Sequence, residues 1–203
     1  MIIKKVIVGE LATNCYVVAD DKSKEALIID PGDEADKIFQ VVRENNFIPR
    51  AIVCTHFHPD HTGVAKEIGD KLNIPVYLHK NEAVMFNKRI MALLDMHDLP
   101  EINYLDDDSE IKIGEMTFKI IPTPGHSNGG ISLYNDKVLF SGDTLFFKEV
   151  GRDDLPGGSW QELKASLKKL SELPPDTKVF PGHGRETTIA SEIESNPYFE
   201  EIK

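Results

Sequence analysis

Thr55-His56-Phe57-His58-Pro59-Asp60-His61 is the most informative stretch of this sequence, and it directly follows the apolar residues 52–54. In an extended chain, positions two apart face the same side, so His56 and His58 can bind one ion together. Pro59 ends the extended run, and the bend can direct Asp60 and His61 at a second ion. Desolvating so many ionisable groups beside a core strand is costly without a metal. The alternative, a histidine-rich surface turn, fits the density of this motif poorly.

Three further candidate ligands each follow an expected strand and lie in a glycine-containing turn. They are His126 after Pro124-Gly125, Asp143 after Ser141-Gly142, and His183 after Pro181-Gly182. Each residue taken alone is more typical of a hydrogen-bonded turn. Taken as a set they have the arrangement expected of ligands that meet at one edge of a pair of packed sheets.

Hydrophobic periodicity predicts both strands and helices along the chain. Strands are expected at 2–8, 15–19, 26–29, 52–54, 76–78, 117–121, 131–134, 138–140 and 178–180, and helices at 33–46, 62–72 and 160–170. Segments 26–30 and 138–143 both end on an aspartate, and segments 50–56 and 178–183 both end on a histidine. This parallel suggests two β-then-α halves packed sheet against sheet, with helices outside, in one domain over 1–203.

The bulk composition narrows the classes of function. Acidic residues outnumber basic ones by 34 to 23, for a formal net charge of −11, which argues against a nucleic-acid surface. No apolar run reaches about 20 residues, so no membrane span is expected. The start of the chain lacks the pattern of a secretory signal. Cys15 and Cys54 lie in apolar stretches, and we expect them to be reduced and buried in a cytoplasmic protein.

The sequence resembles the metallo-β-lactamase superfamily and, within it, the short glyoxalase II-like hydrolases. The resemblance covers nearly the whole chain. Besides the histidine-rich motif, it rests on Thr13-Asn14-Cys15-Tyr16, Ile29-Asp30-Pro31-Gly32, Pro124-Gly125-His126-Ser127, Ser141-Gly142-Asp143-Thr144-Leu145-Phe146, residues 151–158, Pro181-Gly182-His183-Gly184 and Asn196-Pro197.

This resemblance implies an α+β fold, the four-layer αββα sandwich, with the site at one edge. It also implies a role for each candidate ligand. The first metal would be held by His56, His58 and His126, the second by Asp60, His61 and His183, and Asp143 would bridge the two. Asp30 would orient ligands or the loop that carries them. A turn or helix cap before Pro31-Gly32 is the alternative role for Asp30.

The proposed ligands offer nitrogen and oxygen donors and no thiolate, which suits two divalent ions; zinc is favoured, with iron or manganese also compatible. Two such ions lower the pKa of a shared water, so that hydroxide can attack a carbonyl carbon near neutral pH. Asp60 would be both ligand and catalytic residue, holding the nucleophile by a hydrogen bond and carrying its proton.

The resemblance implies a small-molecule substrate, a thioester such as a hydroxyacyl-glutathione. Lys148 and Arg152 are the nearest basic candidates to bind a substrate carboxylate. The alternative for Arg152 is an ion pair with Asp153 or Asp154. The oligomeric state is left open.

Other functions also fit parts of the pattern. A persulfide dioxygenase of the same fold would use one iron held by residues matching His56, His126 or His58, and Asp143. Segment 151–158 favours the glyoxalase branch over a lactonase or β-lactamase, and the intact ligand set argues against a non-catalytic metal-bound module. The methionine-containing segment 83–99 is either an apolar wall over the pocket or a helix core or subunit contact. His79 and His97 match no ligand pattern.

Overall fold

Buried side chains alternate between two cores along the strands of the computed structural model, which describes residues 1–85 and 101–202. On strand β2 (Thr13–Ala19), Cys15 and Val17 pack into one core, whereas Tyr16 and Val18 pack into another. Because successive side chains of a strand point to opposite faces, each face of this sheet must be covered. A helix layer covers one face, and a second sheet covers the other.

The first sheet has the strand order β1-β2-β3-β4-β5-β6. Its other strands are β1 (Ile2–Val8), β3 (Glu25–Ile29), β4 (Ile48–Val53), β5 (Val76–His79) and β6 (Ile102–Leu105). The strands β1, β2 and β3 pair antiparallel, and the pairings from β3 through β6 are parallel. Parallel neighbours place the carboxyl ends of β3 and β4 at the same edge of the sheet.

The second sheet has the order β14-β13-β10-β9-β8-β7. Its strands are β7 (Glu110–Ile113), β8 (Met116–Pro122), β9 (Ile131–Asn135), β10 (Val138–Gly142), β13 (Lys178–Pro181) and β14 (Thr187–Thr188). Its β10 and β13 are parallel, so their carboxyl ends also share one edge. A small hairpin of β11 (Leu145–Phe146) and β12 (Glu149–Val150) follows β10.

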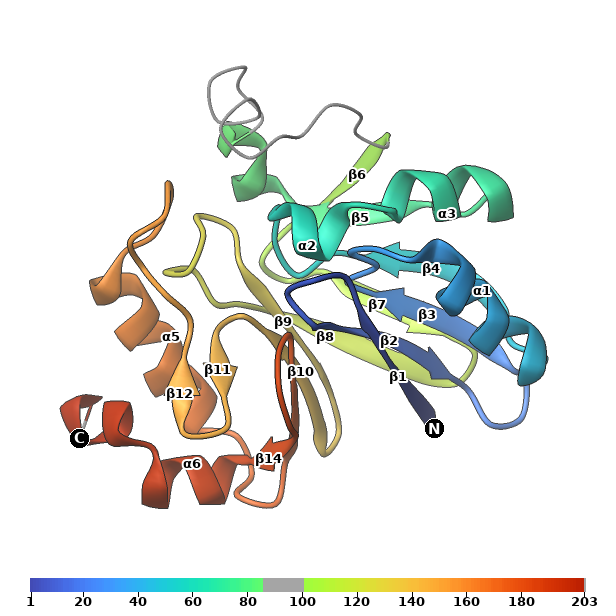
Figure 1. Cartoon of the computed structure of the whole chain (residues 1–203). Helices are drawn as coiled ribbons and strands as arrows, with labels where there is room; N and C mark the ends of the chain where they lie inside the picture. The colour runs from blue at the N-terminus through green and yellow to red at the C-terminus, as the bar shows by residue number, and fades with distance from the viewer. Residues whose placement is uncertain (86–100, 203) are drawn as a thin grey trace.

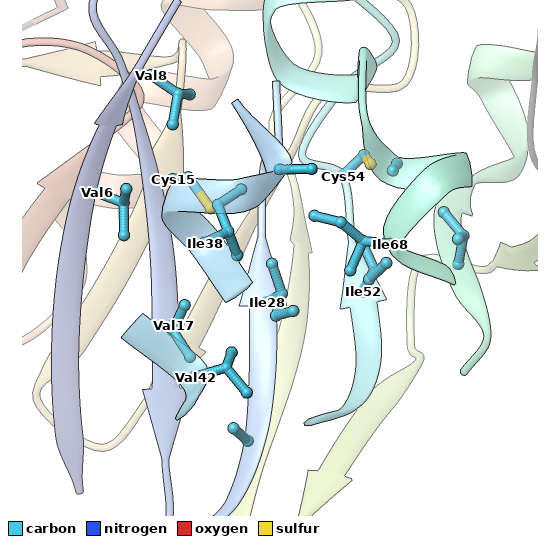
Figure 2. Packing of buried hydrophobic residues seen from close by; sticks show 14 of the residues in the cluster. Val6, Val8, Cys15, Val17, Ile28, Ile38, Val42, Ile52, Cys54 and Ile68 are labelled. Atoms are coloured by element: carbon cyan, nitrogen blue, oxygen red, sulfur yellow. The ribbon is translucent and has the colours of Figure 1, made fainter. Parts of the chain in front are cut away.

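Helices cover the outer face of each sheet (Figure 1). On the first sheet lie α1 (Ala35–Glu44), the short α2 (Pro59–Thr62) and α3 (Ala65–Leu72), with the 3₁₀ helix η1 (Lys80–Met85) after β5. On the second lie α5 (Trp160–Ser171), α6 (Ile189–Ser195) and the 3₁₀ helix η2 (Pro197–Ile202). In Figure 2, Ile38 and Val42 of α1 and Ile68 of α3 lie over Val17, Ile28 and Ile52 of the first sheet.

Three apolar clusters fill the spaces between these layers. One lies between the first sheet and its helices, one between the two sheets, and one between the second sheet and α5, α6 and η2. Phe118 and Phe140 belong to the central cluster, and Leu163 and Leu167 belong to the outer cluster of the second sheet. The sequence of layers is α, β, β, α, which confirms the predicted α+β sandwich.

Several expected elements have different limits. The expected helix at 62–72 is divided: α2 ends at Thr62, and α3 begins at Ala65. Between them the Val64 amide donates to the carbonyl of Pro31, which draws the chain onto the Pro31-Gly32 turn. A Cβ on Gly32 would lie 1.5 Å from the Asp60 carbonyl oxygen, so this close approach requires glycine. The strand expected at 52–54 begins earlier, at Ile48.

The segment 83–99, interpreted from sequence as an apolar wall or a contact, lies mostly outside the described residues, as does His97. Within its described part, Met85 is buried and Val84 is exposed. In residues 1–85 and 101–202, no helix has the length and apolar character needed to cross a membrane.

We expect Phe118→Ala to lower the free energy of unfolding by about 3–5 kcal/mol, because it removes a fully buried ring between the two sheets. Tyr104→Ala is the control, since this β6 side chain is 51% exposed and its loss should change stability by less than about 0.5 kcal/mol. Urea unfolding followed by circular dichroism measures both. Equal stability losses in the two variants would contradict a core between the sheets.

Candidate metal centre

The candidate ligands follow the carboxyl ends of four strands that meet at one edge of the sandwich. The β4 strand leads into the turn with His56 and His58 and then into α2 with Asp60 and His61. The second sheet supplies its ligands after β8, β10 and β13, namely His126, Asp143 and His183. The first sheet therefore contributes four candidates and the second contributes three.

His56, His58 and His126 form one potential metal-binding group, in which one ligand atom from each residue lies within 4.8 Å of the others. His126 Nε2 is 3.0 Å from His58 Nδ1. All three side chains are buried. We refer to this set as the three-histidine group.

Asp60, His61 and His183 form a second such group. His61 Nε2 lies 3.3 Å from His183 Nε2, and Asp60 Oδ2 lies 3.2 Å from His183 Nε2. This group is more open to solvent, because the side chains of Asp60 and His183 are 24% and 28% exposed. We call it the mixed group.

Asp143 contacts both groups. Its Oδ1 lies 3.4 Å from His61 Nε2, and its Oδ2 lies 3.5 Å from His183 Nε2 and 3.7 Å from His126 Nε2. It also forms a potential metal-binding set with His56 and His61. Asp143 therefore lies within reach of both groups.

The donor atoms fit divalent metal ions. Buried polar atoms are normally paired, but six side-chain atoms of the described residues are buried without a hydrogen-bond partner. Three of the six belong to candidate ligands: His56 Nε2, His58 Nε2 and Asp143 Oδ1. Nitrogen and oxygen donors in this number suit zinc, iron and manganese, and the set does not choose between them.

A partner on the other ring nitrogen orients four of the five imidazoles. His56 Nδ1 donates to Thr55 Oγ1, His61 Nδ1 to Asp30 Oδ2, His126 Nδ1 to the Arg152 carbonyl and His183 Nδ1 to the Leu11 carbonyl. In the neutral form of each ring the proton lies on Nδ1 and the lone pair of Nε2 faces the site, whereas in the metal-free chain the raised pKa values of His61 and His183 favour a second proton on Nε2. His58 differs, since its Nδ1 is the atom that faces His126.

Burial keeps the three-histidine group neutral. Desolvation lowers the pKa of His58 to about 3 and the pKa of His56 well below its usual value, and the neighbouring imidazoles lower both further. Desolvation also lowers the pKa of His126, although the Asp143 carboxylate opposes this shift. Neutral imidazole is the form that binds a metal.

Carboxylates dominate the mixed group. Desolvation acts to lower the pKa of His61, but the carboxylates of Asp143 and Asp30 outweigh it and raise that pKa well above its usual value. Desolvation acts to raise the pKa of Asp60, but hydrogen bonds from His183 and His61 outweigh it, so the pKa falls. Asp60 is thus held as a carboxylate, which is the form that binds a cation or accepts a proton.

Asp30 links the three-histidine group to the mixed group through hydrogen bonds. Its Oδ1 accepts from the Thr55 amide at 2.6 Å, and its Oδ2 accepts from Thr55 Oγ1 at 2.8 Å and from His61 Nδ1 at 3.0 Å. Because Thr55 Oγ1 in turn accepts from His56, Asp30 orients one imidazole directly and a second through a hydroxyl. Asp30 does not cap α1, because the N-cap residue of that helix is Glu34. The side chain of Asp30 instead bonds Thr55 and the ligand His61.

The Thr13-Asn14-Cys15-Tyr16 motif secures the loop that presents His183. Asn14 Nδ2 donates to the carbonyls of Pro181 and Gly184, and the Tyr16 hydroxyl donates to Pro181 as well. Thr13 Oγ1 donates to Asp60 Oδ2 at 3.1 Å. The sequence indicated this motif only as part of a resemblance, because nothing in its spacing shows that β2 meets a loop about 170 residues away.

A second contact that the sequence did not indicate involves Glu82 of η1. Its carboxylate is fully buried and accepts hydrogen bonds from the Phe57 amide, the Ser127 hydroxyl and the Gly129 amide. Desolvation raises the pKa of Glu82 to about 7, although these three donors oppose the shift.

The basic candidates differ in their relation to the site. A cavity of about 500 Å³ opens beside it, lined by Leu11, His58, Pro59, Asp60, His126, Asp143, Arg152, Leu155 and His183. Arg152 therefore reaches the cavity, and its guanidinium also pairs with Asp154 through two hydrogen bonds of 2.7 and 2.8 Å. Lys148 is not among the described lining residues, and its Nζ lies 5.5 Å from the Phe147 ring centroid.

Two other sequence interpretations concern residues outside the cavity. His79 is buried, its Nε2 lies 3.1 Å from Asp107 Oδ1, and it belongs to neither ligand group. Cys15 and Cys54 are buried and free. Burial raises the pKa of both thiols well above the usual value, so they are inert side chains of the core.

Comparison with known families and proteins agrees with this geometry. Residues 8–183 match the family described as the metallo-beta-lactamase superfamily. A probable metallo-hydrolase, YqgX of Bacillus subtilis, is 37% identical and covers 96% of each chain. The hydroxyacylglutathione hydrolase GloC of Haemophilus influenzae is 32% identical over 91% of this chain and 92% of its own.

Solved structures extend the comparison. The BLEG-1 B3 metallo-beta-lactamase has a TM-score of 0.89 at 37% identity, covering 97% of this chain and 99% of its own. TTHA1623, solved in a di-iron-bound form, has a TM-score of 0.85 at 36% identity, covering 96% and 99%. ETHE1 from Myxococcus xanthus has a TM-score of 0.84 at 27% identity, covering 97% and 84%. The fold binds divalent metals, and this chain has the histidine and aspartate cluster to do so.

We expect Asp30→Asn to weaken metal binding about 10- to 100-fold, because the single amide oxygen cannot replace both carboxylate oxygens, which accept from the Thr55 amide, Thr55 Oγ1 and His61 Nδ1. Asp20→Asn is the matched control, since Asp20 is also buried and accepts from Lys22 and Ser23 far from the ligands. Competition with a chromogenic chelator measures the affinity. Equal affinities for Asp30→Asn and the unaltered chain would contradict the orienting role.

Proposed function

This chain belongs to the metallo-β-lactamase superfamily, and we propose that it is a hydrolase that uses two divalent metal ions to cleave a small thioester. The observation that carries the proposal is the convergence of seven ligand-type side chains into two adjacent groups that share Asp143. A cavity of about 500 Å³ adjoins them, and this volume suits a small-molecule substrate.

The ligand assignment follows the two groups. His56, His58 and His126 would hold one ion, Asp60, His61 and His183 would hold the other, and Asp143 would contact both. We propose zinc for both positions, because histidine nitrogen and aspartate oxygen are common zinc ligands, although the same donors are compatible with iron and manganese. The di-iron form of TTHA1623 makes iron the principal alternative.

A bound metal pair supplies Lewis acidity and lowers the pKa of a water that both ions share. The chain itself contributes the positioning. We propose that a carboxylate oxygen of Asp60 hydrogen-bonds the nucleophile and takes up its proton. Thr13 Oγ1 donates to Asp60 Oδ2 and fixes the direction of that carboxylate.

The walls of the cavity support a thioester with an anionic group. Leu11, Pro59 and Leu155 provide apolar surface for the acyl and sulfur portions, and Arg152 provides a cation. The similarity to GloC, whose name identifies a hydroxyacylglutathione hydrolase, supports a hydroxyacyl-glutathione as the substrate.

A persulfide dioxygenase is the second candidate, because the chain is 27% identical to ETHE1 over nearly its full length. That reaction would require one iron, for which His56, His126 or His58, and Asp143 are the available ligands. The mixed group favours the hydrolase, since its three donors have no assigned role in a one-iron site.

We expect the purified protein to hold two metal ions per chain and to hydrolyse a hydroxyacyl-glutathione thioester without oxygen uptake. A chelator should abolish turnover, and His58→Ala should lower kcat at least about 100-fold, since a lost ligand is more severe than a lost orienting partner. His79→Ala is the control, as this buried histidine pairs with Asp107 and is in none of the potential metal-binding groups of the described residues.

Metal analysis by mass spectrometry, a thioester assay and an oxygen electrode on the same sample distinguish the candidates. Turnover that resists chelation would contradict a metal-dependent mechanism. One iron with persulfide-dependent oxygen uptake would identify the dioxygenase. Hydrolysis of a β-lactam without thioester cleavage would contradict the proposed substrate alone.

We expect Arg152→Gln to raise KM for the anionic thioester about two- to fivefold with little change in kcat, because exposed charges contribute weakly to binding. The effect should shrink as salt is added. Arg50→Gln is the control, since Arg50 also forms an exposed pair, with Glu25, outside the cavity lining. An equal KM for both variants would exclude Arg152 from substrate binding.

A further inference from the structure

Glu82 connects two segments of chain that carry ligands and are distant in sequence. Its Oε2 accepts from the Phe57 amide at 3.0 Å, and its Oε1 accepts from the Ser127 hydroxyl at 2.8 Å and from the Gly129 amide. Phe57 lies between His56 and His58, and Ser127 directly follows His126. One carboxylate therefore ties the turn after β4 to the loop after β8.

The two loops must be held at one spacing because they supply the three-histidine group. His58 Nδ1 and His126 Nε2 are only 3.0 Å apart, so a displacement of either loop by an ångström would change the ligand geometry. The loop after β8 passes close to Glu82 as well: a Cβ on Gly129 would lie 2.6 Å from the Glu82 amide nitrogen. Only glycine allows this approach.

A carboxylate is energetically unfavourable at this buried position. Glu82 is fully buried, and burying a charge is unfavourable unless hydrogen bonds compensate it. An apolar side chain of similar volume would fill such a space without that cost. What an apolar side chain could not do is accept three hydrogen bonds, two from one loop and one from the other.

We propose that Glu82 is a positioning residue that sets the distance between the His56–His58 turn and the His126 loop for binding of a metal ion. The role rests on the proposed function, because it requires the three-histidine group to be a metal site. Glu82 contacts neither an ion nor a substrate; it acts through main-chain and hydroxyl donors that adjoin the ligands.

The test is Zn²⁺ binding by the purified full chain, measured by competition with a chromogenic chelator. Glu82→Gln keeps the shape of the side chain but replaces one acceptor oxygen by an amide donor, which opposes an N–H or O–H of one loop. We expect one of the two Zn²⁺ ions to bind about 10- to 100-fold more weakly, with the other unchanged. Circular dichroism of the metal-free variant shows whether the fold is kept.

Glu192→Gln is the matched control. Glu192 is also a fully buried glutamate with three donors, the Lys148 amide, the Thr187 hydroxyl and the Asn196 amide group, but it lies on α6 away from the ligand groups. We expect this variant to bind both Zn²⁺ ions with the affinity of the unaltered chain. A similar loss of Zn²⁺ in both variants would overturn the proposal, since the effect would then be general loosening.

If Glu82→Gln does not fold, Ser127→Ala serves in its place, because it removes one donor and leaves the two amide donors. We expect a selective loss of about threefold or more for one Zn²⁺ ion, in keeping with the removal of one hydrogen bond to a charged group. Unchanged Zn²⁺ affinity in the folded variant would overturn the positioning role alone. If the unaltered chain binds no Zn²⁺, iron or manganese, the proposed function and the positioning role both fail.

Discussion

The alignment of the two sheets at one edge is the constraint on which the rest of this site depends. The first sheet supplies His56, His58, Asp60 and His61, and the second supplies His126, Asp143 and His183. A slip of one residue along a strand moves its end by about 3.3 Å, which would separate the two sets. Main-chain hydrogen bonds between the two sheets oppose such a slip. The backbone N–H of Asn14 donates to the Gly182 carbonyl at 2.7 Å, and the backbone N–H of Ile131 donates to the Thr55 carbonyl at 2.9 Å. Glu82 and Tyr16 add side-chain links across the same boundary.

The electrostatics of the centre follow from this alignment. Five imidazoles and two carboxylates occupy a small, largely buried volume, and the two groups differ in the balance between them. Desolvation dominates in the three-histidine group and leaves it neutral, whereas Asp30, Asp60 and Asp143 dominate around His61 and His183. One group thus consists of neutral imidazole nitrogens and the other includes the Asp60 carboxylate, so two ions bound there would have unequal surroundings.

Much of this organisation could be predicted, because it depends on patterns of residues that are close together in the sequence. Continuous apolar runs over 15–19 and 26–29 identified two of the central strands, and the density of histidines after residue 54 identified the candidate metal site. Contacts between distant segments left no such pattern. The break at Gly63 and Val64 depends on the Pro31-Gly32 turn, and the role of Glu82 depends on two loops that are 25 and 45 residues away. The pairing of Arg152 with Asp154 was one of two weighed alternatives, since sequence spacing allows both an ion pair and a free guanidinium.

The ligands follow the strand ends, whereas part of the cavity wall lies on loops. For this reason the ligand set indicates the type of reaction better than it indicates the substrate. Every proposed ligand follows a strand end, and four of the five imidazoles are oriented by a hydrogen-bond partner such as Asp30, so their positions are set by the packed sheets and the loops that join them. The cavity wall is different: Leu11 lies in an exposed turn between β1 and β2, and Arg152 lies in the loop after β12. The side chains of such loops can change without disturbing the sheets, whereas the main-chain carbonyls of Leu11 and Arg152 accept from His183 and His126 and must stay in place. A shared metal centre can therefore serve several ester-like or thioester substrates in relatives of one fold, and the identity of the substrate is decided by the few rim residues that reach beyond the ligands.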